Sequence, residues 1–401
     1  MCSPTKIFQK IRSYARKKIG WRKFMDKYNW IKDIDYKKFV APFEINYDNQ
    51  YLPELKKLLN LFVDELKKCG AEDSVISVAK RYRTQIVNSI ELYYQGNIID
   101  AQSTINELIN DFHNDSIAIS HVNDSIAFPP SREGEKSEVQ FFRARLADNI
   151  TDFPAQNMLH IPFSKREIVK SERFSIPGLP CLYLANSTYT CWIEMGCPAD
   201  HRFNVSPVVL DNTQQIFNLT VSIRDVANFS IVKNQDSEQA NEQLIILIKL
   251  LMLAMGTSFK VKCGNDRNFK SEYILPQMIM LACKQRKLDG ITYYSKQVTD
   301  DIFAQVVGVN LVLFACYNGE EELSDICKHI EIGDSFNYSM FKQLMPSLLY
   351  KSYNLRILNS PYITNIGTFE RQFPYRETLF FEFDQYLFAN WKRNLSDNKK
   401  E

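Results

Sequence analysis

Apolar residues recur three and four positions apart along the amino-terminal part of the chain, a spacing typical of amphipathic helices. A basic, aromatic-rich opening over residues 5–40 fits one or two helices of this kind. Together with the stretches below, it predicts an all-helical amino-terminal domain over residues 1–112. The three clearest helical stretches are residues 52–69, 74–94 and 98–112.

The periodicity disappears over residues 113–138, where Ser, Asn, Asp and Pro dominate, so this segment is predicted to be a linker. From residue 139 the pattern changes to short apolar strands separated by helices, which predicts a mixed α+β domain over residues 139–317. Aromatic residues remain frequent over residues 318–401, and we expect a folded extension packed on that domain. The predicted strands are residues 139–145, 181–185, one or two strands within 206–221, 291–295 and 309–317. The predicted helices are residues 188–195 and 238–255 and a helix that has Pro276 in its first turn and runs to about residue 287.

One stretch, Ser171–Glu194, concentrates the chemistry of this α+β region. Arg173 precedes a Pro-Gly turn, and the apolar residues 181–185 then predict a short buried strand. Ser187 is a good N-cap for the helix that follows, and Glu194 lies about two turns along it between apolar neighbours. We expect this carboxylate to be buried, because its neighbours are apolar, and therefore to need a partner. It either pairs with an arginine as a structural contact or stabilises positive charge on a ligand.

Composition narrows the class of protein. The chain has 401 residues, 45% of them apolar, which is ample for a globular core. A formal charge of +2 gives no general case for binding nucleic acid. Residues 1–40 carry twelve Lys or Arg against three Asp, and we interpret this basic arm as a solvated helical face. Contact of the arm with nucleic acid, anionic lipid or an acidic partner stays open as the alternative.

Cysteine and histidine usage argues against disulfides and metals. The nine cysteines include no CxxC pair, which is typical of thiols in a reducing cytosol, and the five histidines show no metal-ligand spacing. The longest apolar run, residues 244–255, contains Lys249 and is too short to span a membrane. The sequence therefore predicts a cytoplasmic protein without a membrane segment or a metal.

Four segments in order carry a resemblance to a known family. Together they resemble the RES domain, the toxin domain of a bacterial toxin–antitoxin class, over roughly residues 141–316. The helical region ahead of them is similar in placement to the HEPN-like extension of long RES proteins. The segments are FFRAR at 141–145, ERFSIPGLPCLYLANSTYTCWIE at 172–194, EYILPQMIMLACKQRKLDGITYYS at 272–295 and VNLVLF at 309–314.

The resemblance implies a fold related to the ADP-ribosyltransferase toxins and an activity that degrades NAD⁺. The nicotinamide–ribose bond would be cleaved by hydrolysis, or by phosphorolysis with inorganic phosphate as co-substrate. NAD⁺ is then a substrate, and no cofactor or metal is implied. Ser271 stays open as an alternative to the serine named below. Carried over by position, the catalytic residues are Glu194, Arg143 and Tyr183, and the NAD⁺-binding residues are Arg173, Ser295, Gln277 and Asn310.

These residue types suit that chemistry. Cleavage of the bond develops oxocarbenium character on the ribose, which a carboxylate such as Glu194 can stabilise. The pyrophosphate favours guanidinium groups such as Arg143 and Arg173, and Tyr183 can stack on the nicotinamide. The same residues also have structural interpretations: Arg143 as a strand-surface charge, Tyr183 as a core tyrosine and Ser295 as a turn residue at a strand end.

Three alternative functions remain open from the sequence. An active HEPN ribonuclease would need Arg and His four to six residues apart on a helix, and none of the five histidines has an arginine at that upstream spacing. ADP-ribosyl transfer to protein or nucleic acid would use the same pocket with another acceptor. A non-enzymatic module with a degenerate pocket would act through its extensions. The partners to expect are an antitoxin or regulatory protein, and a second copy of the chain through the helical domain.

Overall fold

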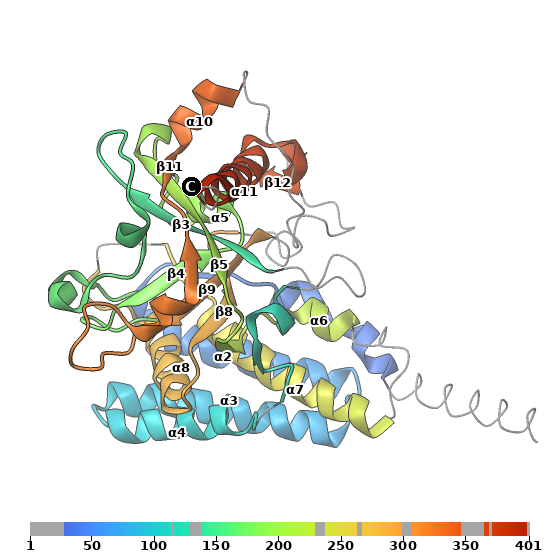
Figure 1. Ribbon diagram of the computed structural model, residues 1–401. Coiled ribbons are helices and arrows are strands. Elements are labelled where there is room, and N and C mark those ends of the chain that lie inside the picture. Colours follow the sequence, from blue (N-terminus) through green and yellow to red (C-terminus); the bar gives the residue numbers. More distant parts are fainter. Residues whose placement is uncertain are drawn as a thin grey trace, which may run out of the picture.

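The computed structural model describes residues 28–113, 115–128, 138–228, 237–262, 267–298, 307–345, 365–368 and 371–398. Most of the basic arm lies outside these ranges. Figure 1 shows a layer of long helices below a twisted sheet, with two further helices, α10 and α11, at the opposite end. The helices are α2 (Tyr51–Lys68), α3 (Asp73–Tyr94), α4 (Ile98–Asn110), α5 (Thr188–Glu194), α6 (Ile223–Asn228), α7 (Ser237–Thr257), α8 (Ile274–Gln285), α10 (Tyr338–Leu344) and α11 (Leu379–Asn398).

The three amino-terminal helices form where the apolar spacing predicts them, within two residues at each end. In α2 the apolar stripe is fully buried, and the helix ends where Gly70 adopts a positive φ of 76°. There the amide of Ala71 donates to the carbonyl of Leu66 at 3.0 Å, a Schellman-type closure that favours glycine. Local sequence therefore determines both the face and the end of this helix.

The main sheet is mixed, and nine strands of the described chain belong to it. Its order is β10-β5-β3-β4-β9-β8-β6-β2, with β11 paired to β5. Neighbouring strands are antiparallel except β6 and β8, which are parallel. The strands are β1 (Phe43–Ile45), β2 (Ile119–His121), β3 (Gln140–Leu146), β4 (Cys181–Ala185), β5 (Phe203–Leu210), β6 (Gln215–Asn218), β7 (Phe259–Val261), β8 (Gly290–Tyr294), β9 (Val309–Phe314), β10 (Ile330–Ile332), β11 (Phe336–Asn337), β12 (Asn365–Thr368) and β13 (Arg371–Pro374).

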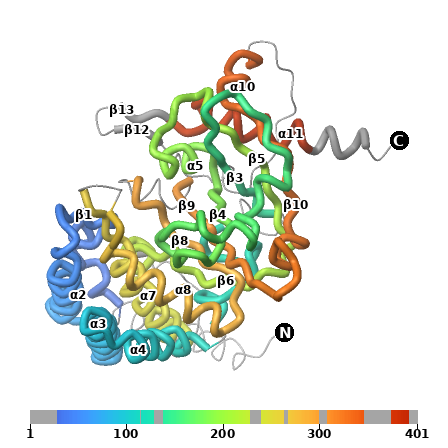
Figure 2. The backbone as a smooth tube through the Cα atoms, turned by 90° about the vertical axis from the view of Figure 1, so that its left-hand side faces the viewer, coloured from blue at the N-terminus to red at the C-terminus, as the bar shows by residue number. Residues whose placement is uncertain are grey.

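Helices from distant parts of the sequence share one core. The helix α3 packs against α2, α4 and α7, and α4 packs against α8. The tube view of Figure 2 shows α2, α3, α4, α7 and α8 gathered on the same side of the sheet. The amino-terminal helices thus bury their apolar faces against helices of the α+β region. The division of the chain into domains stays a prediction. The amino-terminal helices and the α+β region share one hydrophobic core.

The helix α7 is long and rich in apolar residues. One stretch of it, Gln239–Thr257, is long and apolar enough to cross a membrane by length and composition, and 61% of its most apolar part is buried inside the protein. Lys249 lies within this helix, and its Nζ is 3.7 Å from Oδ2 of Asp111. These are the properties of a core helix, with Lys249 paired at the helix–helix boundary.

The α+β prediction is confirmed, and most of its elements form close to the expected bounds. One detail differs. Residues 113–138, predicted to be a linker, include β2, which pairs with β6 at the edge of the sheet. Pro276 lies in the first turn of α8, as predicted, and a 3-10 turn over Ser271–Tyr273 leads directly into this helix.

Candidate active site

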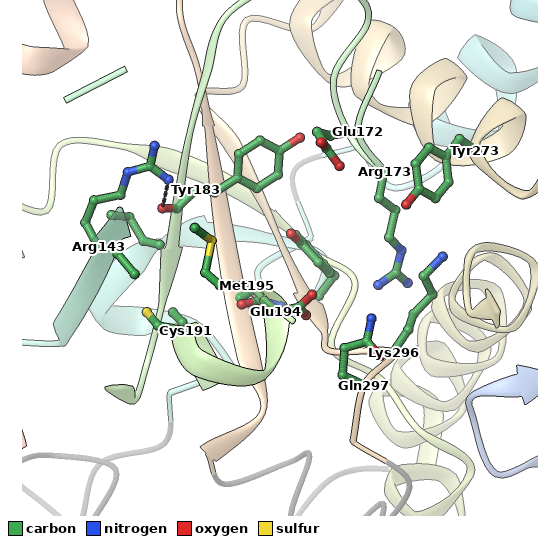
Figure 3. Close-up of a pocket in the computed structure, with 15 residues that line it drawn as sticks. Arg143, Glu172, Arg173, Tyr183, Cys191, Glu194, Met195, Tyr273, Lys296 and Gln297 are labelled. Atoms are coloured by element: carbon green, nitrogen blue, oxygen red, sulfur yellow. Dashed lines mark hydrogen bonds between the residues drawn. The ribbon is translucent and has the colours of Figure 1, made fainter. Parts of the chain in front are cut away.

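A cavity of about 290 Å³ opens where β4, β8 and β9 meet α5 and the segment that precedes β4 (Figure 3). Cross-strand register explains why these strands meet there. Ala185 of β4 and Tyr293 of β8 both lie opposite Asn310 of β9, so all three side chains share one face of the sheet. The cavity is lined by Arg143, Ala144, Glu172, Arg173, Tyr183, Leu184, Ala185, Cys191, Glu194, Met195, Tyr273, Tyr293, Lys296, Gln297 and Asn310.

Glu194 is the last residue of α5. This helix begins as predicted, since the Ser187 hydroxyl accepts a hydrogen bond from the amide of Thr190 at 3.1 Å. The expectation of a buried carboxylate is wrong, because Glu194 is exposed at the end of the helix, where it faces the cavity. Nδ2 of Asn310 donates to Oε1 of Glu194 at 2.8 Å. Among the described residues no arginine forms an ion pair with Glu194, so its role is not that of a structural salt bridge.

Arg143 spans the space between two strands. β3 and β4 are paired at Phe142 and Ala185, and Nη1 of Arg143 donates to the carbonyl oxygen of Tyr183 at 3.0 Å. Its Nε is buried without a hydrogen-bond partner in the described structure. Burial, and then the nearby Arg145, lower the pKa of Arg143 to about 10, so the group stays cationic at neutral pH. A buried guanidinium with an unused donor can bind an anionic or carbonyl group of a ligand.

Arg173 is held more completely than Arg143. Its Nε donates to the carbonyl of Thr257 at 3.0 Å and its Nη1 to the carbonyl of Tyr294 at 2.8 Å. The guanidinium also lies against the ring of Tyr293, 4.8 Å from its centroid, and burial lowers its pKa. These contacts fix a positive charge at the cavity wall. They also use much of the donor capacity of Arg173, so its charge and position contribute more to a ligand than its hydrogen bonds do.

Tyr183 and Glu172 form the upper wall of the cavity in the view of Figure 3. The hydroxyl of Tyr183 is buried, makes no hydrogen bond of normal geometry within the described residues, and has a pKa raised well above 10 by that burial. Glu172 is exposed as a residue, yet burial of its carboxylate raises its pKa, and Glu194 adds to the rise. The cavity is thus lined by a neutral phenol, two carboxyl groups, two guanidinium groups and the amine of Lys296.

Lys296 lines the cavity although the sequence analysis did not select it. Its Nζ donates to the carbonyl of Phe259 at 2.9 Å and lies 4.8 Å from the ring centroid of Tyr273. Burial, and then the charge of Arg173, lower its pKa to about 7. The only signal in the sequence was its place directly after the strand of the ITYYS motif. Figure 3 shows Lys296 and Arg143 on opposite sides of the cavity.

Five of the seven residues proposed from the sequence line this cavity: Arg143, Arg173, Tyr183, Glu194 and Asn310. The other two lie elsewhere. Gln277 donates through Nε2 to the hydroxyl of Ser171 at 2.9 Å and to the carbonyl of Ser175 at 3.0 Å, so it holds the loop that carries Arg173. Ser295 is buried, borders a small neighbouring cavity, and accepts from the amide of Gln297 at 3.1 Å, which stabilises a turn.

Ser271, the alternative serine, lies outside the cavity. Ser271 donates to the main-chain oxygen of Asp48 at 2.8 Å, and it is not among the lining residues of the cavity. Within the described ranges, no group of three or more His, Cys, Asp or Glu side chains is placed to hold a metal ion. The donor chemistry of the cavity therefore rests on guanidinium, ammonium, phenol, amide and carboxylate groups.

Comparison with known proteins gives two likenesses, and no family model matches the chain. The chain is 31% identical over 266 residues to "Putative toxin YopC" of Bacillus subtilis (strain 168). The match covers 63% of this chain and 55% of the relative, so the chain spans about half the length of that protein. Among solved structures it is similar to a chain of the M. tuberculosis MbcT–MbcA toxin–antitoxin complex. That likeness covers 61% of this chain and 97% of the other, at 12% identity and a TM-score of 0.28, which is too low to carry an argument.

Proposed function

We propose that this protein is a toxin of the RES type that cleaves the nicotinamide–ribose bond of NAD⁺. One observation carries the proposal. The cavity gathers Arg143, Arg173, Tyr183, Glu194 and Asn310 from five separate parts of the chain, which are β3, the segment before β4, β4, α5 and β9. Glu194, the last residue of α5, accepts a hydrogen bond from Asn310 that orients its carboxylate. The resemblance of the sequence motifs to the RES domain names the same residues independently of their placement.

The chemistry assigned to the cavity follows from its charges. As the bond to nicotinamide breaks, positive charge develops on the ribose, and the Glu194 carboxylate stabilises it. Nicotinamide leaves as a neutral molecule, so no strong general acid is required. With water as the acceptor the products are nicotinamide, ADP-ribose and a proton. With phosphate they are nicotinamide and ADP-ribose 1″-phosphate.

The cations divide the binding work. Arg143 donates from Nη1 to Tyr183 and Lys296 donates one of its three protons to Phe259, so both have donors left for phosphate oxygens. Arg173 supplies a fixed charge next to Lys296 (Figure 3). We assign the pyrophosphate of NAD⁺ to these groups and the nicotinamide riboside to the part of the cavity lined by Tyr183 and Glu194.

The toxin role rests on the likeness to the Bacillus subtilis protein named as a putative toxin. A protein that destroys NAD⁺ would stop growth unless it were restrained, so we propose that an antitoxin or another regulatory protein binds this chain. A cytoplasmic site of action fits a substrate found in that compartment. A role in defence against phage belongs to the same proposal.

The direct test is incubation of the purified chain with NAD⁺, with and without inorganic phosphate, and separation of the products by chromatography. Nicotinamide with ADP-ribose in both conditions supports hydrolysis, and a phosphorylated ADP-ribose that appears only with phosphate supports phosphorolysis. Transfer of label from NAD⁺ to protein or nucleic acid would instead favour an ADP-ribosyltransferase. Unchanged NAD⁺ in every condition would contradict the proposal and favour a binding module.

A further inference from the structure

The first turn of α5 is held by the carboxy-terminal helix α11. Oδ1 of Asp384 accepts a hydrogen bond of 2.9 Å from the amide of Thr188, the first residue of α5. The hydroxyl of Thr188 donates to the carbonyl of Phe380 at 3.2 Å. The two helices lie side by side in both Figure 1 and Figure 2. A residue almost two hundred positions away thus satisfies an amide that a helix start leaves without an internal partner.

The side chain of Asp384 is fully buried, and burial of a carboxylate costs free energy. It forms no ion pair with any residue in the described ranges, and its second oxygen accepts from the hydroxyl of Tyr375 at 2.6 Å. The ionisable groups that face it are Tyr375, Tyr338 and Cys191. Burial of a carboxylate without a cation costs free energy, and hydrogen bonds to the carboxylate must offset that cost. The hydrogen bond from Thr188 is one of those that do so for Asp384.

The geometry connects this contact to the cavity. α5 has seven residues, about two turns, so Thr188 and Glu194 stand at its two ends. A helix this short is not stable alone and takes its position from its anchors. Phe380 of α11 packs on the same helix, with ring centroids 5.3 Å from Tyr189 and 5.4 Å from Trp192. Displacement of the first turn would therefore move the carboxylate at the last one.

We propose that Asp384 is a positioning residue, which sets the place of Glu194 in the cavity by fixing the start of α5. The carboxy-terminal extension is then part of the enzyme rather than an appended module. This inference rests on the proposed function for its effect on turnover. Its effect on the helix itself does not depend on that function.

The test compares two substitutions whose side chains have the same number of heavy atoms and the same branching. Asp384→Asn keeps an oxygen that can accept from the Thr188 amide, whereas Asp384→Leu fills the same space without an acceptor. With NAD⁺ as substrate, we expect Asp384→Leu to lower kcat about 10-fold or more with KM within about twofold, because a small misplacement of a reacting group has effects of this size. We expect Asp384→Asn to stay within about threefold of the unchanged protein.

Amide hydrogen exchange of the same variants provides a readout without catalysis. We expect faster exchange over residues 187–195 in Asp384→Leu, and unchanged exchange over β4. If Asp384→Leu does not fold, Thr188→Pro removes the donor from the other side, at a helix position that tolerates proline, and the same results are expected. Equal kcat in the Leu and Asn variants, or unchanged exchange over α5, would overturn the inference. If the unchanged protein has no NAD⁺ turnover, the proposed function fails, and exchange over α5 alone decides the positioning role.

Discussion

Nδ2 of Asn310 donates a 2.8 Å hydrogen bond to Oε1 of Glu194, and thereby connects the central strand β9 to the last residue of α5. Asn310 is itself nearly buried, at 5% exposure, whereas Glu194 is exposed. The Glu194 carboxylate is therefore held by a hydrogen bond from the sheet, and its remaining surface is open to the cavity. A group held in this way is prepared for a ligand without rearrangement, which is the condition for electrostatic stabilisation of a transition state.

Removal of this hydrogen bond should lower turnover. We expect Asn310→Ala to reduce the rate of nicotinamide release about 10-fold, because a hydrogen bond to a charged group is worth about 1.5–3 kcal/mol. Asn310→Asp should reduce it further, since a second carboxylate beside Glu194 favours protonation of one of the pair. Steady-state assays at neutral pH compare the rates of nicotinamide release by the two variants. A faster rate for Asn310→Asp than for Asn310→Ala would contradict this role.

The two arginines of the cavity should respond differently to the same substitution. Arg173→Lys loses donors to two backbone carbonyls, of Thr257 and Tyr294, so we expect a loss of stability of about 2 kcal/mol or more. Arg143→Lys should lower turnover with a stability change within about 1 kcal/mol, because Arg143 makes one such bond. Urea unfolding together with the NAD⁺ assay separates the two effects. Equal stability of the two variants would show that Arg173 is not the more structural group.

Lys296 should make stability depend on pH in the alkaline range. Its pKa is lowered to about 7 by burial and by Arg173, so between pH 7 and about 10 the unfolded chain binds more protons at this position than the folded one. Stability attributed to this residue therefore rises with pH across that window. Lys296→Met removes the cost of the buried charge, and we expect it to melt above the unchanged protein at pH 7, with the difference closing toward pH 10. A constant difference in melting temperature would contradict the lowered pKa.

Asp384 should make stability fall as the pH rises, in a lower pH range than the one in which Lys296 acts. Burial raises its pKa to about 7, so between about pH 4 and 7 the folded chain binds more protons here than the unfolded one. Its contribution to stability is full below about pH 4 and is lost as the pH rises through 7. Thermal melts of Asp384→Asn against the unchanged protein from pH 4 to 8 isolate this residue. We expect the unchanged protein to lose stability relative to the variant as pH rises, and a difference independent of pH would argue against the raised pKa.

Local signals in the sequence were enough to predict the strand and the helix start next to the site. The strand Cys181–Ala185 and the N-cap at Ser187 follow from neighbouring residues, and both are confirmed. The exposure of Glu194 did not follow, because apolar neighbours along a helix do not reveal that the helix ends there at an open cavity. What decides it is the position of Asn310, more than a hundred residues away.

Contacts between distant segments explain what the sequence analysis missed. A lysine after a strand has no periodic signature, and the burial of Lys296 depends on Phe259 and Tyr273, which its own motif does not contain. The anchoring of α5 by Asp384 likewise joins residues far apart in the chain. Gln277 and Ser295 lie in the expected motifs, but their side chains serve the backbone of the loop before β4 and of the turn after β8.

The most direct test of the account is the release of nicotinamide from NAD⁺ by the unchanged protein and by Glu194→Gln, with Glu320→Gln as the control at an exposed position outside the cavity. We expect release by the unchanged protein and by Glu320→Gln at equal rates. Glu194→Gln should be at least about 100-fold slower, because its amide cannot stabilise the charge that develops on the ribose. A Glu194→Gln rate equal to that of the unchanged protein, or no release by any of the three, would contradict the central claim.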